Sequence, residues 1–205
     1  TLQRVDWTRD LHFHTQTTMD TLDYSGTSVN AGSKLVIAAS GEIKRDLWKD
    51  IPADLTLSVG FSHPQIALEG ILVIEGPQWL GQIQAQAEIK RLADTLASDI
   101  LTGLPLIVVV DDSSFTTDSL NNFLWVTFTR SNPSHDLHGV REFIQNKHWG
   151  CHGSVIIDAR IKKHHAPPLV EDPEVSFKVD QLIEQGKLPF LKSGSQSSAI
   201  EKRPS

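Results

Sequence analysis

The residues best able to do chemistry gather between Leu124 and Leu169. This stretch holds six of the nine histidines and the only cysteine. Two short apolar runs in it, 124–128 and 155–157, are rich in β-branched or aromatic residues and are predicted to be buried strands. Charged residues follow each run, and in open α/β sheets the loops after strands line the binding crevice. We therefore expect any chemistry to lie near Arg130 and Asp158.

Arg130 suits the binding of a carboxylate, because its planar fork matches two oxygens. An ion pair with Asp136 or Asp158 explains the same residue equally well. Asp158, Arg160 and Lys162 alternate along the chain and would share one face if the second strand continues. A row of this kind is more typical of a contact between subunits than of a catalytic base.

Metal and thiol chemistry are the next possibilities. His148 and His152 are four residues apart, a spacing that suits zinc on a helix. Gly150 and the glycine after His152 make a regular helix improbable there, so we expect no zinc site. Cys151 would need a lowered pKa and a base to act as a nucleophile, and no oxyanion device is evident beside it.

Two further pairs of polar residues have simple structural explanations. His12 and His14 would point to one face of a strand and could share a metal, but a pair of histidines on a half-exposed strand is the simpler interpretation. Asp111 and Asp112 follow an apolar run and resemble a metal or ribose site. Capping of the next helix by these carboxylates is the more frequent role.

Composition narrows the class of protein. The chain has 205 residues with 39% hydrophobic and 21% charged, which suits a globular domain with a substantial core. Its net charge of −6 argues against nucleic-acid binding. One cysteine cannot form an internal disulfide, so a cytoplasmic location is expected. We find neither a run long enough to span a membrane nor a signal peptide, and the start at Thr1 agrees with a piece of a longer protein.

The pattern of apolar residues predicts an α/β fold. Helices are expected to flank a mixed or mainly parallel sheet in one domain at 34–192, after an irregular segment at 1–33 and before a flexible tail at 193–205. The predicted strands are 34–39, 55–59, 71–74, 106–110, 124–128 and 155–157. The predicted helices are 82–98, a short helix at 119–123 after a capped turn at 113–118, helical turns at 140–146, a short turn in 41–52, and a last helix from Asp172-Pro173 to Gly186.

Several longer phrases resemble one known family. TFTRSNPSHD, KHWGC, VIIDARIKKHHAPPL and the earlier MDTLDYSGTSVNAGSKLVIAA are similar to the C-terminal part of UbiD-type decarboxylases, over roughly residues 6–173. The resemblance implies an enzyme that uses prenylated FMN and a divalent metal (Mn) to add or remove carboxylate on aromatic or α,β-unsaturated acids. The family's catalytic arginine and two glutamates, and its flavin and metal ligands, belong to an earlier domain that no segment here matches.

The resemblance therefore implies a C-terminal domain that joins subunits and forms one wall of a cleft. We expect no catalytic residue, no bound metal and no flavin in this chain alone; its partners would be the flavin domain of the same polypeptide and further copies. The cleft-facing candidates are Arg130, Phe143, Lys147 and His148. Segment 138–149 could close over the substrate, although ordinary core packing would also explain Phe143 and Ile144.

Two other expectations follow from the sequence. Trp48, Trp79 and the last helix, Pro173 to Gln185, are candidate contact surfaces for self-association. A different class of function is a stand-alone metal-dependent hydrolase that uses the histidine-rich segment 135–165, and metal analysis would separate it from the decarboxylase domain.

Overall fold

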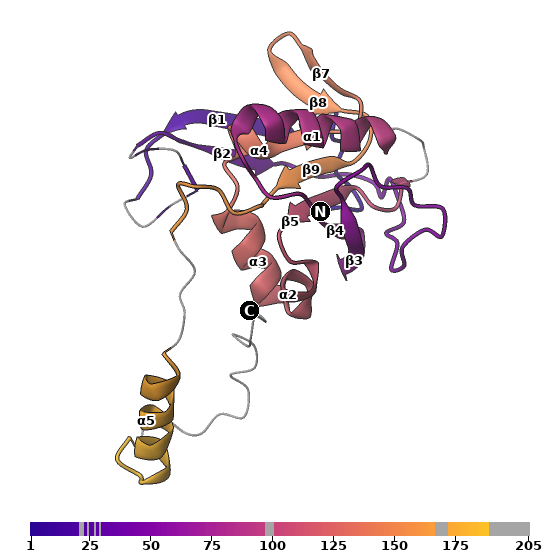
Figure 1. The fold of residues 1–205 in the computed structure, drawn as a ribbon. Coiled ribbons are helices and arrows are strands. Elements are labelled where there is room, and N and C mark those ends of the chain that lie inside the picture. The colour runs from indigo at the N-terminus through magenta and orange to yellow at the C-terminus, as the bar shows by residue number, and fades with distance from the viewer. Residues whose placement is uncertain are drawn as a thin grey trace. The chain divides into compact units, whose positions relative to one another are not determined.

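Figure 1 shows the fold of the chain in a computed structural model. The structure describes residues 1–20, 23, 25–26, 28, 30–96, 101–166 and 172–188. Residues 1–165 form one compact unit and residues 166–205 form a second. The described part contains no helix long and apolar enough to cross a membrane.

A five-stranded sheet forms the centre of the first unit. Its strand order is β3 (Ser62–Leu68), β4 (Ile71–Glu75), β5 (Leu106–Val110), β9 (Val155–Asp158) and β6 (Leu137–Gly139). The three middle strands are parallel, and the two outer strands run antiparallel to their neighbours. The expected α/β fold with a mixed sheet is therefore confirmed.

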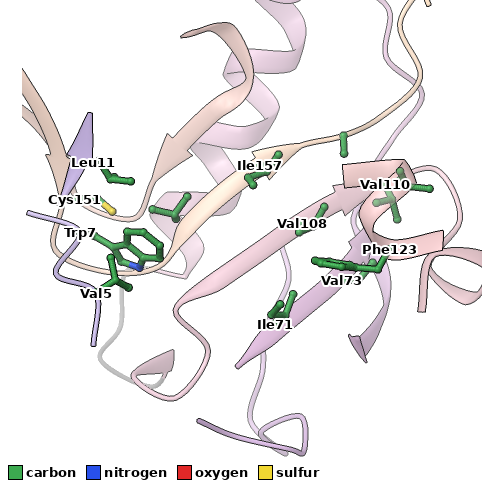
Figure 2. Close-up of a cluster of buried hydrophobic side chains, with 13 residues drawn as sticks. Val5, Trp7, Leu11, Ile71, Val73, Val108, Val110, Phe123, Cys151 and Ile157 are labelled. Carbon is green, nitrogen blue, oxygen red and sulfur yellow. The ribbon is translucent and has the colours of Figure 1, made fainter. Parts of the chain in front are cut away.

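The middle strands are apolar on both faces because both faces are covered. On one face, α1 (Gln82–Thr95) packs Ile89 and Leu92 against the even-numbered residues of β4 and the odd-numbered residues of β5. On the other face, α3 (Leu120–Thr129) inserts Phe123. Figure 2 shows this second cluster, in which Phe123 lies beside the strand residues. Two separate cores thus hold the sheet from opposite sides.

The N-terminal segment 1–33 is irregular only in part, which corrects our expectation. It contains β1 (Leu11–Thr17) and the start of β2 (Gly32–Ile37), which pair antiparallel. Trp7 lies in the core with its neighbours Val5 and Leu11 (Figure 2), and its indole nitrogen donates to the Pro105 carbonyl at 3.0 Å. The polar composition hid these anchors, which are widely spaced along the chain.

The predicted strand 124–128 is wrong, because these residues belong to helix α3. Its N-terminus is fixed by Ser119, whose hydroxyl accepts a hydrogen bond from the Asn122 backbone N–H at 3.2 Å. Only Phe123, Val126 and Thr127 of this helix are buried, a helical spacing that the run of apolar letters concealed. The preceding short helix α2 (Ser113–Asp118) is capped by Asp112 as expected.

The helical turns predicted at 140–146 are also wrong. This segment forms a hairpin of β7 (Glu142–Gln145) and β8 (His148–Cys151). Asn146 and Lys147 connect the strands with φ values of 51° and 65°, the left-handed conformation of a two-residue hairpin turn. A one-turn helix α4 (Pro133–Asp136) precedes β6. Residues 41–52 and 55–59, expected to hold a helical turn and a strand, lie in no helix or strand.

The second unit contains the last helix, α5 (Pro173–Glu184), as predicted. Asp172 caps it by accepting from the backbone N–H of Glu174 at 2.9 Å. Gly186, with φ of 67°, follows its end. None of its residues is buried. The tail expected at 193–205 lies outside the described residues.

Candidate functional site

Charged side chains collect at the carboxyl ends of the three parallel strands. β4 ends at Glu75, Asp111 follows β5, and Asp158 ends β9. Register places these ends together, because Glu75 lies opposite Val110 and Asp158 opposite Val109. Loops at this edge line the binding crevice in open α/β sheets, so this cluster is the first candidate site.

Arg160 is the centre of a buried ionic network. Its side chain is fully buried and forms two hydrogen bonds to Asp158, from Nε to Oδ1 (2.8 Å) and from Nη2 to Oδ2 (2.7 Å). The Nη1 atom donates to Glu88 Oε2 and to the Pro77 carbonyl, each at 2.7 Å. Arg160 therefore joins β9 to α1 and to the loop after β4.

Lys162 makes a second buried pair beside it. Its ammonium lies 3.4 Å from Asp136 Oδ2 and donates to the carbonyls of Arg130, Asp158 and Arg160 at 2.8, 3.0 and 3.3 Å. These contacts tie the end of α3, the end of β9 and α4 together. The row Asp158, Arg160, Lys162 thus lies in the interior, whereas we expected a surface row suited to a contact between subunits.

Arg130 is paired with Asp111, with 3.6 Å between Nη1 and Oδ2, and its side chain is 19% exposed. The sequence suggested Asp136 or Asp158 as the partner, and these two carboxylates carry the ion pairs with Lys162 and Arg160. Asp111 also accepts from the backbone N–H of Ile161 at 2.8 Å. The arginine expected to hold a substrate carboxylate is thus in contact with a carboxylate of its own chain.

Proton affinities at this edge suit a structural role. Burial acts to raise the pKa of Asp158, but the hydrogen bonds and charge of Arg160 outweigh it and hold the pKa below its usual value. For Asp136, burial outweighs the charge of Lys162 and raises the pKa. Both carboxylates are occupied by cationic partners. The arrangement fixes the loops after the strands and leaves neither group placed as a general base.

The hairpin β7–β8 borders a surface hollow of about 520 Å³. It is lined by Thr8, Phe143, Gln145, Asn146, His148 and His152. The imidazole of His148 contacts the Thr8 carbonyl through Nε2 at 3.0 Å. Because a carbonyl only accepts, Nε2 carries a proton in this contact. Lys147 lies in the turn of the same hairpin.

The candidate residues fall into two groups. Phe143, Lys147 and His148 belong to the hairpin, which leads into the amino end of β9. Arg130 follows α3 and contacts Asp111 just beyond the carboxyl end of β5. Since β5 and β9 are parallel, Arg130 lies at the carboxyl ends of the parallel strands. The other three residues lie together at the amino ends.

The histidine-rich segment does not assemble a metal centre in the described residues. No group of three or more histidine, cysteine or acidic side chains there could hold an ion. The rings of Phe143 and His152 pack 5.0 Å apart, and Phe143 lies over Gly150, midway in sequence between His148 and His152. This packing opposes a metal shared by the two histidines.

Cys151 and His165 are two further reactive groups in this segment. Burial, and then the charge of Glu142, raise the pKa of Cys151 to about 12, so its thiol stays protonated. His165 accepts from the Lys162 backbone N–H at 3.1 Å. Burial and the charge of Lys162 lower its pKa to about 4.

One surface that sequence reasoning missed is the outer side of α3. Four large apolar side chains are exposed there: Leu120, Leu124, Trp125 and Phe128, at 54, 44, 63 and 59%. Their helical spacing after Ser119 was the available signal. Assigning 124–128 to a buried strand concealed it.

Comparison with known proteins gives consistent matches. The model for the 3-octaprenyl-4-hydroxybenzoate carboxy-lyase C-terminal domain (UbiD_C) matches residues 1–39. A 4-hydroxybenzoate decarboxylase subunit of Chlamydia pneumoniae is 31% identical over 180 residues, which cover 88% of this chain and 29% of that protein. An uncharacterized protein of Chlamydia caviae is 33% identical over 182 residues, which cover 86% of this chain and 28% of that protein. The chain thus spans under a third of each relative.

Solved structures give a weaker likeness. Vanillic acid decarboxylase of Sedimentibacter hydroxybenzoicus is 21% identical in its open form, with a TM-score of 0.33, over 56% of this chain and 27% of that one. The closed form is 20% identical with a TM-score of 0.35, over 57% and 27%. The sequence matches, in contrast, extend over most of the chain: residues 1–39 are similar to the 3-octaprenyl-4-hydroxybenzoate carboxy-lyase C-terminal domain, and 180 residues are similar to the 4-hydroxybenzoate decarboxylase subunit.

Proposed function

We propose that this chain is the C-terminal part of a UbiD-like decarboxylase, in which it joins subunits and forms one wall of the substrate cleft. The whole enzyme would act reversibly and without oxidation on aromatic or α,β-unsaturated carboxylic acids, in the cytoplasm. Support comes from the 31% identity to a 4-hydroxybenzoate decarboxylase subunit over 88% of this chain. Because the match covers only 29% of that protein, the catalytic groups would come from the remainder.

The observation that carries a joining role is the apolar outer face of α3. Its four exposed side chains recur at helical spacing, and α3 has no charged residue from Leu120 to Thr129. Contiguous apolar surface on a globular domain marks a protein contact. The absence of charge on α3 allows a like surface or another domain to approach it without repulsion, despite the net charge of −6.

Helix α5, taken by itself, supports the same proposal. It is 12 residues long and has no buried residue. A helix of this length is marginal in water unless an apolar face is packed. Its exposed apolar side chains are Val175, Phe177, Val179 and Leu182. We therefore retain Pro173 to Gln185 as a contact surface for another copy.

The two tryptophans that the sequence suggested for this contact are weaker candidates than Trp125. Trp48 is half-buried because its indole packs over Gly103, where a Cβ would meet Cδ1 at 2.1 Å. Trp79 is half-buried as well. Trp125 is 63% exposed, so it replaces them as the main aromatic contact.

The described residues do not fit prenylated FMN or its metal. A phosphate needs uncommitted backbone N–H groups or cations, but the cations Arg160 and Lys162 are buried against carboxylates. A divalent metal needs several free oxygen ligands, and Asp136, Asp158 and Asp111 are held by basic side chains. We therefore assign cofactor and metal to another domain and expect this chain alone to retain neither.

The hairpin hollow is the proposed cleft wall. Its mixture of a phenyl ring, imidazoles and amides is the kind of lining that small-molecule sites use. In the whole enzyme, Phe143, Lys147 and His148 would face the flavin domain. Arg130 lies at the carboxyl ends of the parallel strands, where we propose that it faces a separate part of the domain boundary.

Light scattering after size-exclusion chromatography tests the joining role. We expect the 22.7 kDa chain to show a mass above that of one copy that rises with concentration. The double change Trp125→Ser and Phe128→Ser should lower it, whereas Ile144→Ser, at a hairpin residue that is more exposed (76%), should not. A strict monomer at high concentration, or an equal effect of Ile144→Ser, would refute the assignment of this surface.

A further inference from the structure

Strand β1 presents two histidines to solvent on one face. The opposite face is turned to the core: Leu11 is 1% exposed, and the Phe13 ring packs edge-on against Trp149 with 5.7 Å between centroids. Because side chains alternate along a strand, His12 and His14 must both lie on the outer face. Both are exposed, so their rings are accessible from solvent.

The pairing with β2 fixes the positions of these histidines. His12 lies opposite Val36 and His14 opposite Lys34. Residues two apart on a strand are separated by about 6.6 Å between their Cα atoms. Two imidazoles at that separation can converge on one ion at the nitrogen–metal distance of about 2.0–2.1 Å. The ladder loses its regular register only after His14, so both ligands stand on the regular part of the strand.

We propose that His12 and His14 form a two-imidazole chelate for a late first-row divalent cation, Cu²⁺, Ni²⁺ or Zn²⁺. Imidazole nitrogen favours these ions, whereas Mg²⁺, Ca²⁺ and Mn²⁺ require oxygen ligands. The cross-strand partners, Val36 and Lys34, supply no oxygen ligand. The site is therefore distinct in chemistry from the manganese centre proposed for the whole enzyme.

This chelate leaves coordination positions for water or for a group from another molecule. It is open and exchangeable, in contrast to structural zinc sites with four protein ligands. The ammonium of Lys34 opposes a bound cation from the neighbouring strand, which keeps the affinity moderate. The same geometry makes Lys34 the position at which a third imidazole would complete the site.

Titration of the purified chain with CuSO₄ in a non-chelating buffer tests the proposal, with electron paramagnetic resonance to count coordinated nitrogens. We expect about one ion bound through two imidazole nitrogens. His12→Ala and His14→Ala should each lower the affinity by about tenfold or more. Each leaves a single imidazole, and the ion loses the second ligand that the strand holds close to the first. His63→Ala, at an exposed histidine elsewhere (71%), should leave the affinity unchanged.

A gain of affinity provides the sharper check. Lys34→His should tighten binding by about tenfold or more and add a third nitrogen to the spectrum, since cross-strand neighbours lie about 4.5–5.5 Å apart. Circular dichroism would establish that each variant is folded. If neither His12→Ala nor His14→Ala changes the affinity, or if Mn²⁺ binds here as tightly as Cu²⁺, the proposal is wrong.

Discussion

Replacement of Arg160 by methionine should destabilise the chain severely. Methionine matches the length of the aliphatic part of the side chain but removes the guanidinium, which makes three hydrogen bonds to carboxylates and one to the Pro77 carbonyl. The side chains of Asp158 and Glu88 are only 2% and 6% exposed. The variant therefore leaves two carboxylates in the interior without their cation.

Removal of one partner of a buried ion pair costs about 3–5 kcal/mol. We expect Arg160→Met to fall in this range in free energy of unfolding at pH 7. Two buried carboxylates lose their partner, which raises the cost. The neighbouring Lys162 offsets part of the unpaired charge of Asp158, which lowers it. The surface pair of Lys90 with Asp94, at 3.3 Å with side chains 75% and 66% exposed, provides the control: Lys90→Met should cost less than about 1 kcal/mol.

The cost should depend on pH in a defined direction. Burial alone would raise the pKa of Asp158, and Arg160 holds it below the usual value. The interaction therefore contributes stability above about pH 4 and is lost as the pH falls through the pKa of the folded carboxyl. The difference between wild type and Arg160→Met should be largest near neutral pH and should shrink below about pH 4.

Urea unfolding followed by circular dichroism and tryptophan fluorescence would measure these differences. Adding Asp158→Asn to Arg160→Met should recover part of the loss, because the uncompensated charge is then absent. A cost no larger than that of Lys90→Met, or a difference independent of pH between 3 and 7, would show that the network is not a buried ionic one.

Two further predictions concern the hairpin and the thiol of Cys151 at the end of its second strand. Phe143→Ala should destabilise the chain by about 1–3 kcal/mol, because the ring is half-buried against His152 and Gly150. This is below the cost of about 3–5 kcal/mol for a fully buried phenylalanine. Ile144→Ala, at a residue 76% exposed, should change stability by less than about 0.5 kcal/mol. Equal melting losses for both variants would contradict this. Cys151 should react with a disulfide reagent at pH 8 far more slowly in the native chain than in urea. Burial raises its pKa to about 12, so on the order of one thiol in 10⁴ is a thiolate at that pH. Equal rates in the two conditions would mean that the thiol is accessible.

The strands and helices with one unambiguous local signal could be predicted from the sequence. The apolar runs of β4, β5 and β9 and the periodic helix α1 were found because hydrophobic spacing is a local property. The cap residues Asp112 and Asp172 were found for the same reason, since a cap acts on backbone groups two or three residues away. These elements already implied an α/β sheet with covered faces.

The sequence by itself therefore determined the family resemblance, the α/β class and the elements with strong periodicity. Only the tertiary structure decided that 124–128 is helical, that 142–151 is a hairpin, and which cation pairs with which carboxylate. A short apolar run is compatible with both the two-residue period of a strand and the 3.6-residue period of a helix. Which element forms depends on the residues that cover the run in the fold. Arg160 meets Glu88, which lies 72 residues away, and Trp7 meets Pro105 across 98 residues. Contacts of this range exist only once the sheet has brought distant segments together, so no local pattern could assign them.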